Sequence, residues 1–190
     1  MISPFERKLA DIASEEFRVF GGHHEADPVL SARIKSYWAD LKMTFPGVDT
    51  PWSAVFVSWC VKQAGGDKKE FLFSAQHSQF VKRAIDNAEA RKGVFRGIKF
   101  DEASPAIGDI IQWNRPGNSF DFAHAATHDD YPSHSAIVVS LGQDSGGQFV
   151  TTIGGNEADT VGRTRVPLNA SGLIAQRTKM PFISLIQTLK

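Results

Sequence analysis

Three polar residues that lie far apart in the sequence have the types that acyl transfer requires. Ser53 lies in the first turn of an apolar segment that opens with Thr50-Pro51. His134 precedes the apolar run 136–139, and Asn156 follows the next strand-like stretch. A hydroxyl at a helix start, a histidine at a strand start and an amide on the next strand together predict a site of nucleophilic catalysis.

Each of these residues has a definite expected role. A serine hydroxyl is a poor nucleophile until a base takes its proton, and backbone N–H groups at a helix start can hold an oxyanion beside Ser53. His134 is the expected base. A hairpin would bring Asn156 back beside His134, where its amide oxygen could orient the imidazole by accepting the second N–H. Glu157 and Asp159 are alternative orienting groups.

Other residues have competing interpretations. Cys60 is a second candidate nucleophile, but it would lie two turns beyond Ser53, about 10 Å along the helix, and free cysteine is usually a core residue. Trp52 and Trp113 are candidates for lining a cleft, although Trp113 at a strand end is as easily a core residue. Arg115 could meet a carboxylate of a substrate.

The segment between residues 121 and 130 contains residue types that can bind a metal. It holds two histidines and three aspartates: His124, His128, Asp121, Asp129 and Asp130. Zinc ligands normally follow a regular spacing, which this segment lacks. A solvated or substrate-lining loop is therefore favoured, and no metal or other cofactor is expected.

The elements that must position these residues change type along the chain. Helix signals mark 5–20 after a Ser3 cap, a second helix from Asp27-Pro28 to before Pro46, a third from Thr50-Pro51 to Gly65, and a fourth that opens at Ser74. Strand patterns follow at 94–100, 107–113, 135–141, 149–153, 161–166 and 183–189. The order predicts an α+β domain, with 116–132 as a long loop.

Composition excludes several classes of protein. The 190 residues contain 42% hydrophobic residues, enough for one sizeable core, and Lys+Arg equals Asp+Glu at 21 each. Neither nucleic acid nor an anionic membrane is an expected partner. The lone Cys60 excludes an internal disulfide. The first residues lack a long apolar stretch, so we expect neither a signal peptide nor a membrane span, with synthesis in the cytoplasm and export by another route.

Four motifs in order carry a resemblance to a known superfamily. The segments 51–60, 108–113, 133–139 and 153–157 resemble the motif set of the NlpC and CHAP cell-wall peptidases and amidases, over roughly residues 50–167. A serine after Pro-Trp, together with segment 73–80, resembles an uncharacterised bacterial family related to those enzymes. This resemblance makes His77 a candidate oxyanion donor, against a surface or capping role.

The resemblance implies a papain-like fold of N-terminal helices packed on an antiparallel sheet or half-barrel of about six strands. We expect one domain, with 1–48 as a helical extension and 49–190 as the catalytic core. The implied activity is a peptidoglycan amidase or endopeptidase without a cofactor: Ser53 attacks the carbonyl, His134 acts as base and then acid, and Asn156 orients the ring. The backbone N–H of Ser53 and the side chain of His77 would hold the oxyanion.

The sequence departs from the better-known families at Ser53, where they have a cysteine. Three explanations stay open: a serine variant of the chemistry, a site that has lost catalysis and kept binding, or a cysteine replaced by engineering.

The biological setting also has alternatives. Peptidoglycan or its peptide fragments are the expected partners, acting in the periplasm or cell wall after delivery. An antibacterial effector with a cognate immunity protein, a phage lysin and an inactive wall-binding module are each compatible with the sequence.

Overall fold

The computed structural model describes residues 2–47 and 49–190 and has five helices and six strands over these residues. The helices are α1 (Pro4–Phe20), α2 (Pro28–Asp40), α3 (Ser53–Ala64), α4 (His77–Glu89) and α5 (Phe122–Thr127). The strands are β1 (Phe95–Lys99), β2 (Ile110–Asn114), β3 (Ser133–Asp144), β4 (Gly147–Glu157), β5 (Thr160–Pro167) and β6 (Phe182–Thr188). The predicted α+β class is confirmed.

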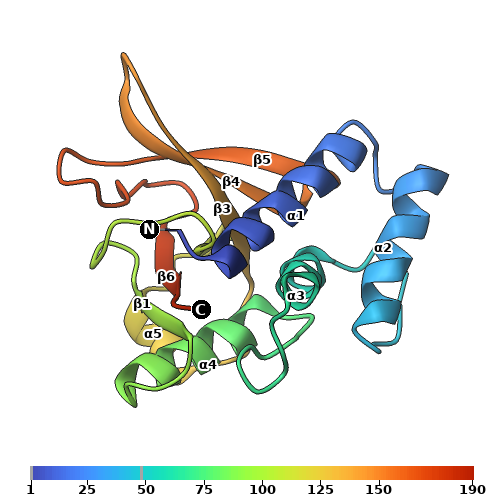
Figure 1. Cartoon of the computed structure of the whole chain (residues 1–190), viewed down its shortest axis with the longest axis horizontal. Helices are drawn as coiled ribbons and strands as arrows, with labels where there is room; N and C mark the ends of the chain where they lie inside the picture. Colours follow the sequence, from blue (N-terminus) through green and yellow to red (C-terminus); the bar gives the residue numbers. More distant parts are fainter. Residues whose placement is uncertain (1, 48) are drawn as a thin grey trace.

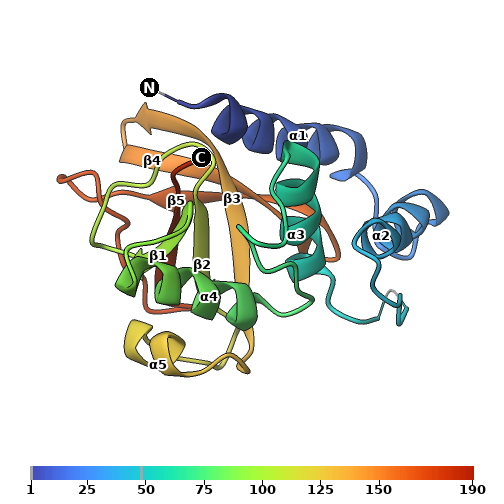
Figure 2. The same ribbon diagram turned by 60° about the horizontal axis from the view of Figure 1, so that its bottom comes forward.

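The strands form one open sheet in the order β1-β6-β2-β3-β4-β5, and every neighbouring pair is antiparallel. Figures 1 and 2 show α1 lying along β3, β4 and β5, with α3 beside it and α2 on the outside. Helix α4 packs on β1. This arrangement brings the start of α3 next to the sheet, because α3 contacts both β3 and β4.

The first helix forms as its sequence predicts. Ser3 Oγ accepts from the backbone N–H of Glu6, and the Glu6 carboxylate accepts from the backbone N–H of Ser3, which completes a capping box. Phe5, Leu9 and Ala13 recur on one face and are buried. The amphipathic stripe therefore fixes which side of α1 covers the sheet.

The third helix is apolar on nearly all sides because other elements surround it. Ten of its residues are buried, and it packs against α1, α2, β3 and β4. It ends at Gly65, whose φ of 107° is a left-handed conformation that favours glycine. Cys60 lies in this core with no exposed surface, and burial raises the pKa of its thiol. Its location agrees with a structural role.

Several predicted boundaries were wrong. Helix α2 ends at Asp40 rather than just before Pro46, and β2 begins at Ile110 rather than at 107. The fourth helix begins at His77 rather than Ser74, and the Ser74 hydroxyl instead accepts from the backbone N–H of Gln76 in a local turn before the helix. The loop 116–132 contains α5, a helix of 6 residues capped by Asp121. A helix this short is less than two turns long, so it leaves no readable period in the sequence.

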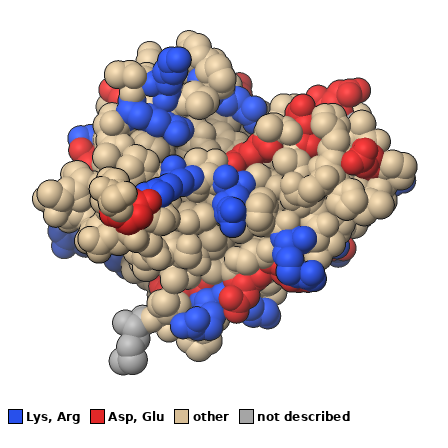
Figure 3. Space-filling view, turned by 90° about the horizontal axis from the view of Figure 1, so that it is seen from above, with Lys and Arg blue, Asp and Glu red and all other residues tan. Residues whose placement is uncertain are grey.

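The surface agrees with the balanced composition. Figure 3 shows basic and acidic side chains interspersed over one face of the molecule. Over residues 2–47 and 49–190, no helix is long and apolar enough to cross a bilayer.

Candidate active site

The hydroxyl of Ser53 lies at the first residue of α3 and meets two cationic or potentially cationic side chains. His77 Nε2 is 2.6 Å from Ser53 Oγ, and Arg115 Nη2 donates to the same oxygen at 3.2 Å. Ser53 is only 1% exposed. The N–H groups of the first turn of a helix have no intrahelical partners, so they add positive potential beside this oxygen.

His77 is held as a neutral ring. Burial, together with the nearby His134 and Arg115, holds the pKa of His77 well below its usual range. Its Nδ1 is buried and has no hydrogen-bond partner among the described residues. Because unpaired buried N–H groups are rarer than unused lone pairs, the proton is assigned to Nε2, which then donates to Ser53 Oγ.

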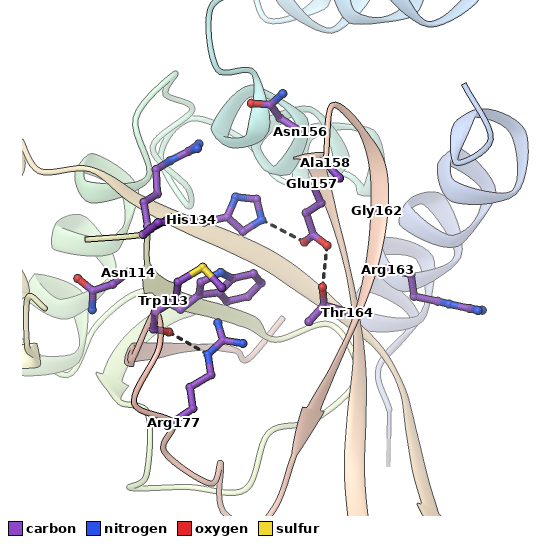
Figure 4. Close-up of a pocket in the computed structure, with 13 residues that line it drawn as sticks. Trp113, Asn114, His134, Asn156, Glu157, Ala158, Gly162, Arg163, Thr164 and Arg177 are labelled. Carbon is purple, nitrogen blue, oxygen red and sulfur yellow. Dashed lines mark hydrogen bonds and ion pairs between the residues drawn. The ribbon is translucent and has the colours of Figure 1, made fainter. Parts of the chain in front are cut away.

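His134 has the contact that His77 lacks, a carboxylate. It is the second residue of β3, pairs with Trp113 across the sheet, and its ring centroid lies 4.7 Å from that of Trp113. His134 Nε2 lies 3.1 Å from Glu157 Oε1, and Glu157 Oε2 accepts from Thr164 Oγ1 at 2.8 Å (Figure 4). The carboxylate oxygen therefore accepts a hydrogen bond from Nε2–H of His134, and Nδ1 is the ring nitrogen left to accept a proton.

Two glycines make room for the Glu157 carboxylate. A Cβ at Gly154 would lie 2.5 Å from Glu157 Oε1 and 3.0 Å from His134 Nε2. A Cβ at Gly162, on the neighbouring strand β5, would lie 2.3 Å from the Glu157 Cβ. Gly154 and Gly162 are thus explained by the close approach of a side chain, and not by the need for a turn.

Gly154→Ala is therefore expected to separate Glu157 from His134 without unfolding the protein. The new Cβ would also lie 3.1 Å from the Ala136 Cβ in a buried part of the sheet, so the stability loss should be about 1–3 kcal/mol, as at other overpacked positions. Long-range NMR correlations of the imidazole nitrogens should show the His134 ring altered. Gly22→Ala is the matched control, since its Cβ would meet nothing within 4 Å. Unchanged His134 signals in Gly154→Ala would contradict this geometry.

Asn156, the predicted orienting residue, makes a different contact. Its Nδ2 donates to Glu25 Oε2 at 2.8 Å, and Trp52 Nε1 donates to the same carboxylate oxygen at 2.8 Å. Asn156 has φ of 56°, so this side-chain contact helps to hold a left-handed backbone. Glu25 thereby connects Trp52, the residue before Ser53, to Asn156, the residue before Glu157. The contact to the imidazole of His134 is made by Glu157 instead of Asn156.

The remaining predicted residues divide between the site and the core. Trp52 is fully buried and stacks near Tyr37, so it supports the start of α3 rather than lining a cleft. Trp113 is 6% exposed and lines the cavity beside His134. His124 and His128 stack on each other in and after α5, with ring centroids 4.0 Å apart. Within the described part of the chain, no cluster of three or more metal-binding side chains occurs.

Two adjoining hollows meet at Arg115. A cavity of about 510 Å³ is lined by Trp113, Arg115 and His134, and a second hollow of about 430 Å³ is lined by Ser53, His77 and Arg115. The ring centroids of His77 and His134 are 5.3 Å apart. The serine and both histidines therefore share one region of the surface, with the Arg115 guanidinium between the two hollows.

The arrangement assigns different chemical properties to the two imidazoles. His77 stays neutral at neutral pH and acts as a hydrogen-bond donor to the hydroxyl oxygen. His134 has the Glu157 carboxylate 3.1 Å from Nε2, so the site has a counter-charge next to this ring. Arg115 supplies a fixed positive charge at Ser53 Oγ.

Sequence reasoning missed Glu25, Thr164 and Arg177, which lines the larger cavity. Glu25 bonds to residues that are remote in the chain, and Arg177 meets Trp113 only in the folded protein, so no local pattern marks either.

Comparison with known proteins gives one relationship. The family described as "Uncharacterized protein conserved in bacteria (DUF2272)" matches residues 20–184. No curated protein and no solved structure matches the chain. The matched segment covers most of the 190 residues, including the serine, both histidines and Glu157, and the chain therefore belongs to this uncharacterised bacterial family.

Proposed function

We propose that the protein is a peptidoglycan-directed amidase or endopeptidase with a papain-like arrangement of helix and sheet. The single observation that carries the proposal is the hydroxyl of Ser53 at a helix start, 2.6 Å from His77, whose ring centroid lies 5.3 Å from that of His134, a histidine in contact with a carboxylate. A nucleophile, a base and an orienting group within one site are what acyl transfer requires. The resemblance of the motif order to the NlpC and CHAP enzymes supports the choice of substrate.

The proposed mechanism begins with transfer of the Ser53 proton to Nδ1 of His134. Both lone pairs of Ser53 Oγ accept, from His77 and Arg115, so the hydroxyl proton is free for a third group. Glu157 stabilises the imidazolium that forms. The serine oxygen attacks the amide carbon, and His134 returns the proton to the leaving amine.

The developing oxyanion is stabilised by positive groups at the start of α3. The backbone N–H of Ser53 belongs to the first residue of α3, and the Nε2–H of His77 and the Arg115 guanidinium lie at the hydroxyl. Water then attacks the acyl group with His134 as base, which restores Ser53.

Incubation of purified sacculi tests the proposal directly. Wild-type protein should release new muropeptides, and Ser53→Ala protein should not. Ser53→Cys should retain activity, because a thiol is more acidic than a hydroxyl and the site already offers positive charge. Identical muropeptide profiles for wild type and Ser53→Ala would remove the serine-hydrolase proposal.

A second candidate is a wall-binding module without chemistry. The observation that favours it is the burial of Ser53, which is 1% exposed with Arg115 across its hydroxyl. Sedimentation of the protein with insoluble peptidoglycan, with no fragment released by the wild type, would select this candidate. Delivery as an antibacterial effector or a phage lysin is compatible with the hydrolase, and neighbouring genes would separate the two.

A further inference from the structure

The larger cavity of the candidate site carries an excess of positive charge. Three arginines line it, Arg115, Arg163 and Arg177, with one carboxylate, Glu157. Glu157 is already engaged by His134 and Thr164. Arg163 lies over the ring of Phe17 and points away from the cavity in Figure 4. Arg115 and Arg177 are therefore the cationic groups available to a molecule in this cavity.

Arg177 is held in place by neutral groups. Its Nε donates to the carbonyl oxygen of Met180 at 2.9 Å, and its guanidinium carbon lies 4.4 Å from the ring centroid of Phe182 and 5.5 Å from that of Trp113. Its Nη2 is buried and has no hydrogen-bond partner among the described residues. Burial lowers the pKa of Arg177, and the nearby Glu157 carboxylate opposes this shift without forming an ion pair with the guanidinium. A carboxylate that enters the cavity would therefore stabilise a half-buried guanidinium whose hydrogen-bonding capacity is only partly used.

Arg115 repeats this pattern at the other end of the cavity. Its Nη2 and Nε donate to neutral oxygens, Ser53 Oγ and the Ser133 carbonyl, and burial lowers its pKa. Over residues 2–47 and 49–190, neither Arg115 nor Arg177 forms an ion pair. An anion that contacts Arg115 in this cavity would lie next to the serine hydroxyl. Planar guanidinium groups bind carboxylates through paired hydrogen bonds, which also fixes orientation.

We propose that this cavity is a carboxylate subsite, in which Arg177 is the main anchor and Arg115 the second contact. The inference rests on the proposed function and narrows its substrate: the peptide cleaved carries a free carboxylate near the scissile amide. Stem peptides of the wall occur with such a carboxylate free or converted to a carboxamide. The subsite selects the free form.

Binding can be measured without turnover in the Ser53→Ala protein. Calorimetric titration would use two synthetic stem-peptide fragments that differ only in one group, a carboxylate or a carboxamide beside the scissile bond. The carboxylate form should bind about tenfold to a hundredfold more tightly, as expected for hydrogen bonds to a charged group. Arg177→Gln should abolish the preference, and Arg177→Lys should keep part of it.

Arg165→Gln is the matched control, because Arg165 also lies over an aromatic ring, that of Phe149, but pairs with Asp144 far along the sheet. It should leave the preference unchanged. Thermal melting of each variant would exclude loss of the fold. Equal affinity for the two peptides, no binding of either, or a preference that survives Arg177→Gln would overturn the subsite.

The outcomes separate this inference from the hydrolase proposal. A carboxylate preference in Ser53→Ala protein, with no fragments released from sacculi by the wild type, keeps the subsite and removes the hydrolase. If the wild type hydrolyses both peptides and the Ser53→Ala protein binds them with equal affinity, the hydrolase proposal stands and the subsite is removed.

Discussion

Replacement of His134 by alanine is expected to lower kcat for release of wall fragments by about a thousandfold or more, because general acid–base catalysis contributes factors of this order. His134 is the ring whose Nε2 contacts a carboxylate, 3.1 Å from Glu157. Its removal leaves the Ser53 proton without an acceptor. Glu157→Gln should cause a smaller loss, since the amide still orients the ring but no longer neutralises the imidazolium.

His77→Gln provides the contrast that identifies the base. His77 lies 2.6 Å from Ser53, yet its loss should cost only about a hundredfold, the usual effect of removing one oxyanion donor. Burial, with His134 and Arg115 nearby, lowers the pKa of His77. The ring therefore takes up a proton only at a pH below the ordinary histidine range, and the acid limb of the activity profile should persist in His77→Gln.

Relative rates decide between the two histidines. The loss in His134→Ala should exceed that in His77→Gln, while His128→Ala, a change at an exposed histidine after α5, should leave the rate unchanged. If His77→Gln loses more activity than His134→Ala and also loses the acid limb, then His77 is the base and the assignment above is wrong.

The effect of His77 on stability has a definite sign. The pKa of His77 is lowered in the folded state, so below the ordinary histidine pKa, about 6.5, the unfolded chain binds more protons than the folded chain. Stability should therefore fall as pH decreases below that value. His77→Gln should weaken this dependence, which urea denaturation at several pH values can measure.

Local signals predicted most of the fold. Ser3 and Glu6 predict a capping box, and helix α1 begins directly after Ser3. Each of the six apolar segments predicted as strands forms a strand. One exception has an identifiable cause. Ser74 resembles a helix cap, but its hydroxyl oxygen accepts from the backbone N–H of Gln76 in a local turn, which competes with capping.

The site was only partly predictable, because its contacts join distant segments. The motif order identified Ser53, His134 and the segment 153–157, but Asn156 and Glu157 are adjacent and both are plausible partners for a histidine. The choice between them depends on Glu25, which is 131 residues from Asn156 in sequence and takes its amide. Arg177 lies in a segment with no helix or strand pattern, and only the folded chain places it beside Trp113.

Long-range contacts also involve the N-terminal helices, which the sequence predicts as a helical extension, 1–48, within a single domain. In the structure, Leu9 and Tyr37 lie in one hydrophobic cluster with α3. Glu16 of α1 accepts hydrogen bonds from Arg33 and Tyr37 of α2. The two helices are therefore joined to each other and to the helix that starts at Ser53 by shared burial as well as by polar contacts.

Glu16→Ala is expected to reduce the free energy of unfolding by about 3–5 kcal/mol, the usual cost of removing one partner of a buried ionic cluster. Glu16 is 6% exposed, and Tyr37 has no exposed surface, so the tyrosine hydroxyl would lose its acceptor inside the core. The Arg33 guanidinium, which lies 4.5 Å from the ring centroid of Trp59, would lose its counter-ion. For a chain of 190 residues the melting temperature should fall by roughly 6–20 °C.

The neighbouring residue gives the matched control. Glu15 pairs with Arg18 on the exposed side of the same helix, and Glu15→Ala should cause no measurable change. Glu16→Gln should fall between the two, because the amide oxygen can still accept from Tyr37. Urea unfolding followed by both circular dichroism and Trp fluorescence would also show whether Glu16→Ala unfolds in one transition. A single weakened transition means that residues 1–48 belong to the folding unit that holds Ser53, whereas stability equal to that of Glu15→Ala would show that the cluster contributes nothing to it.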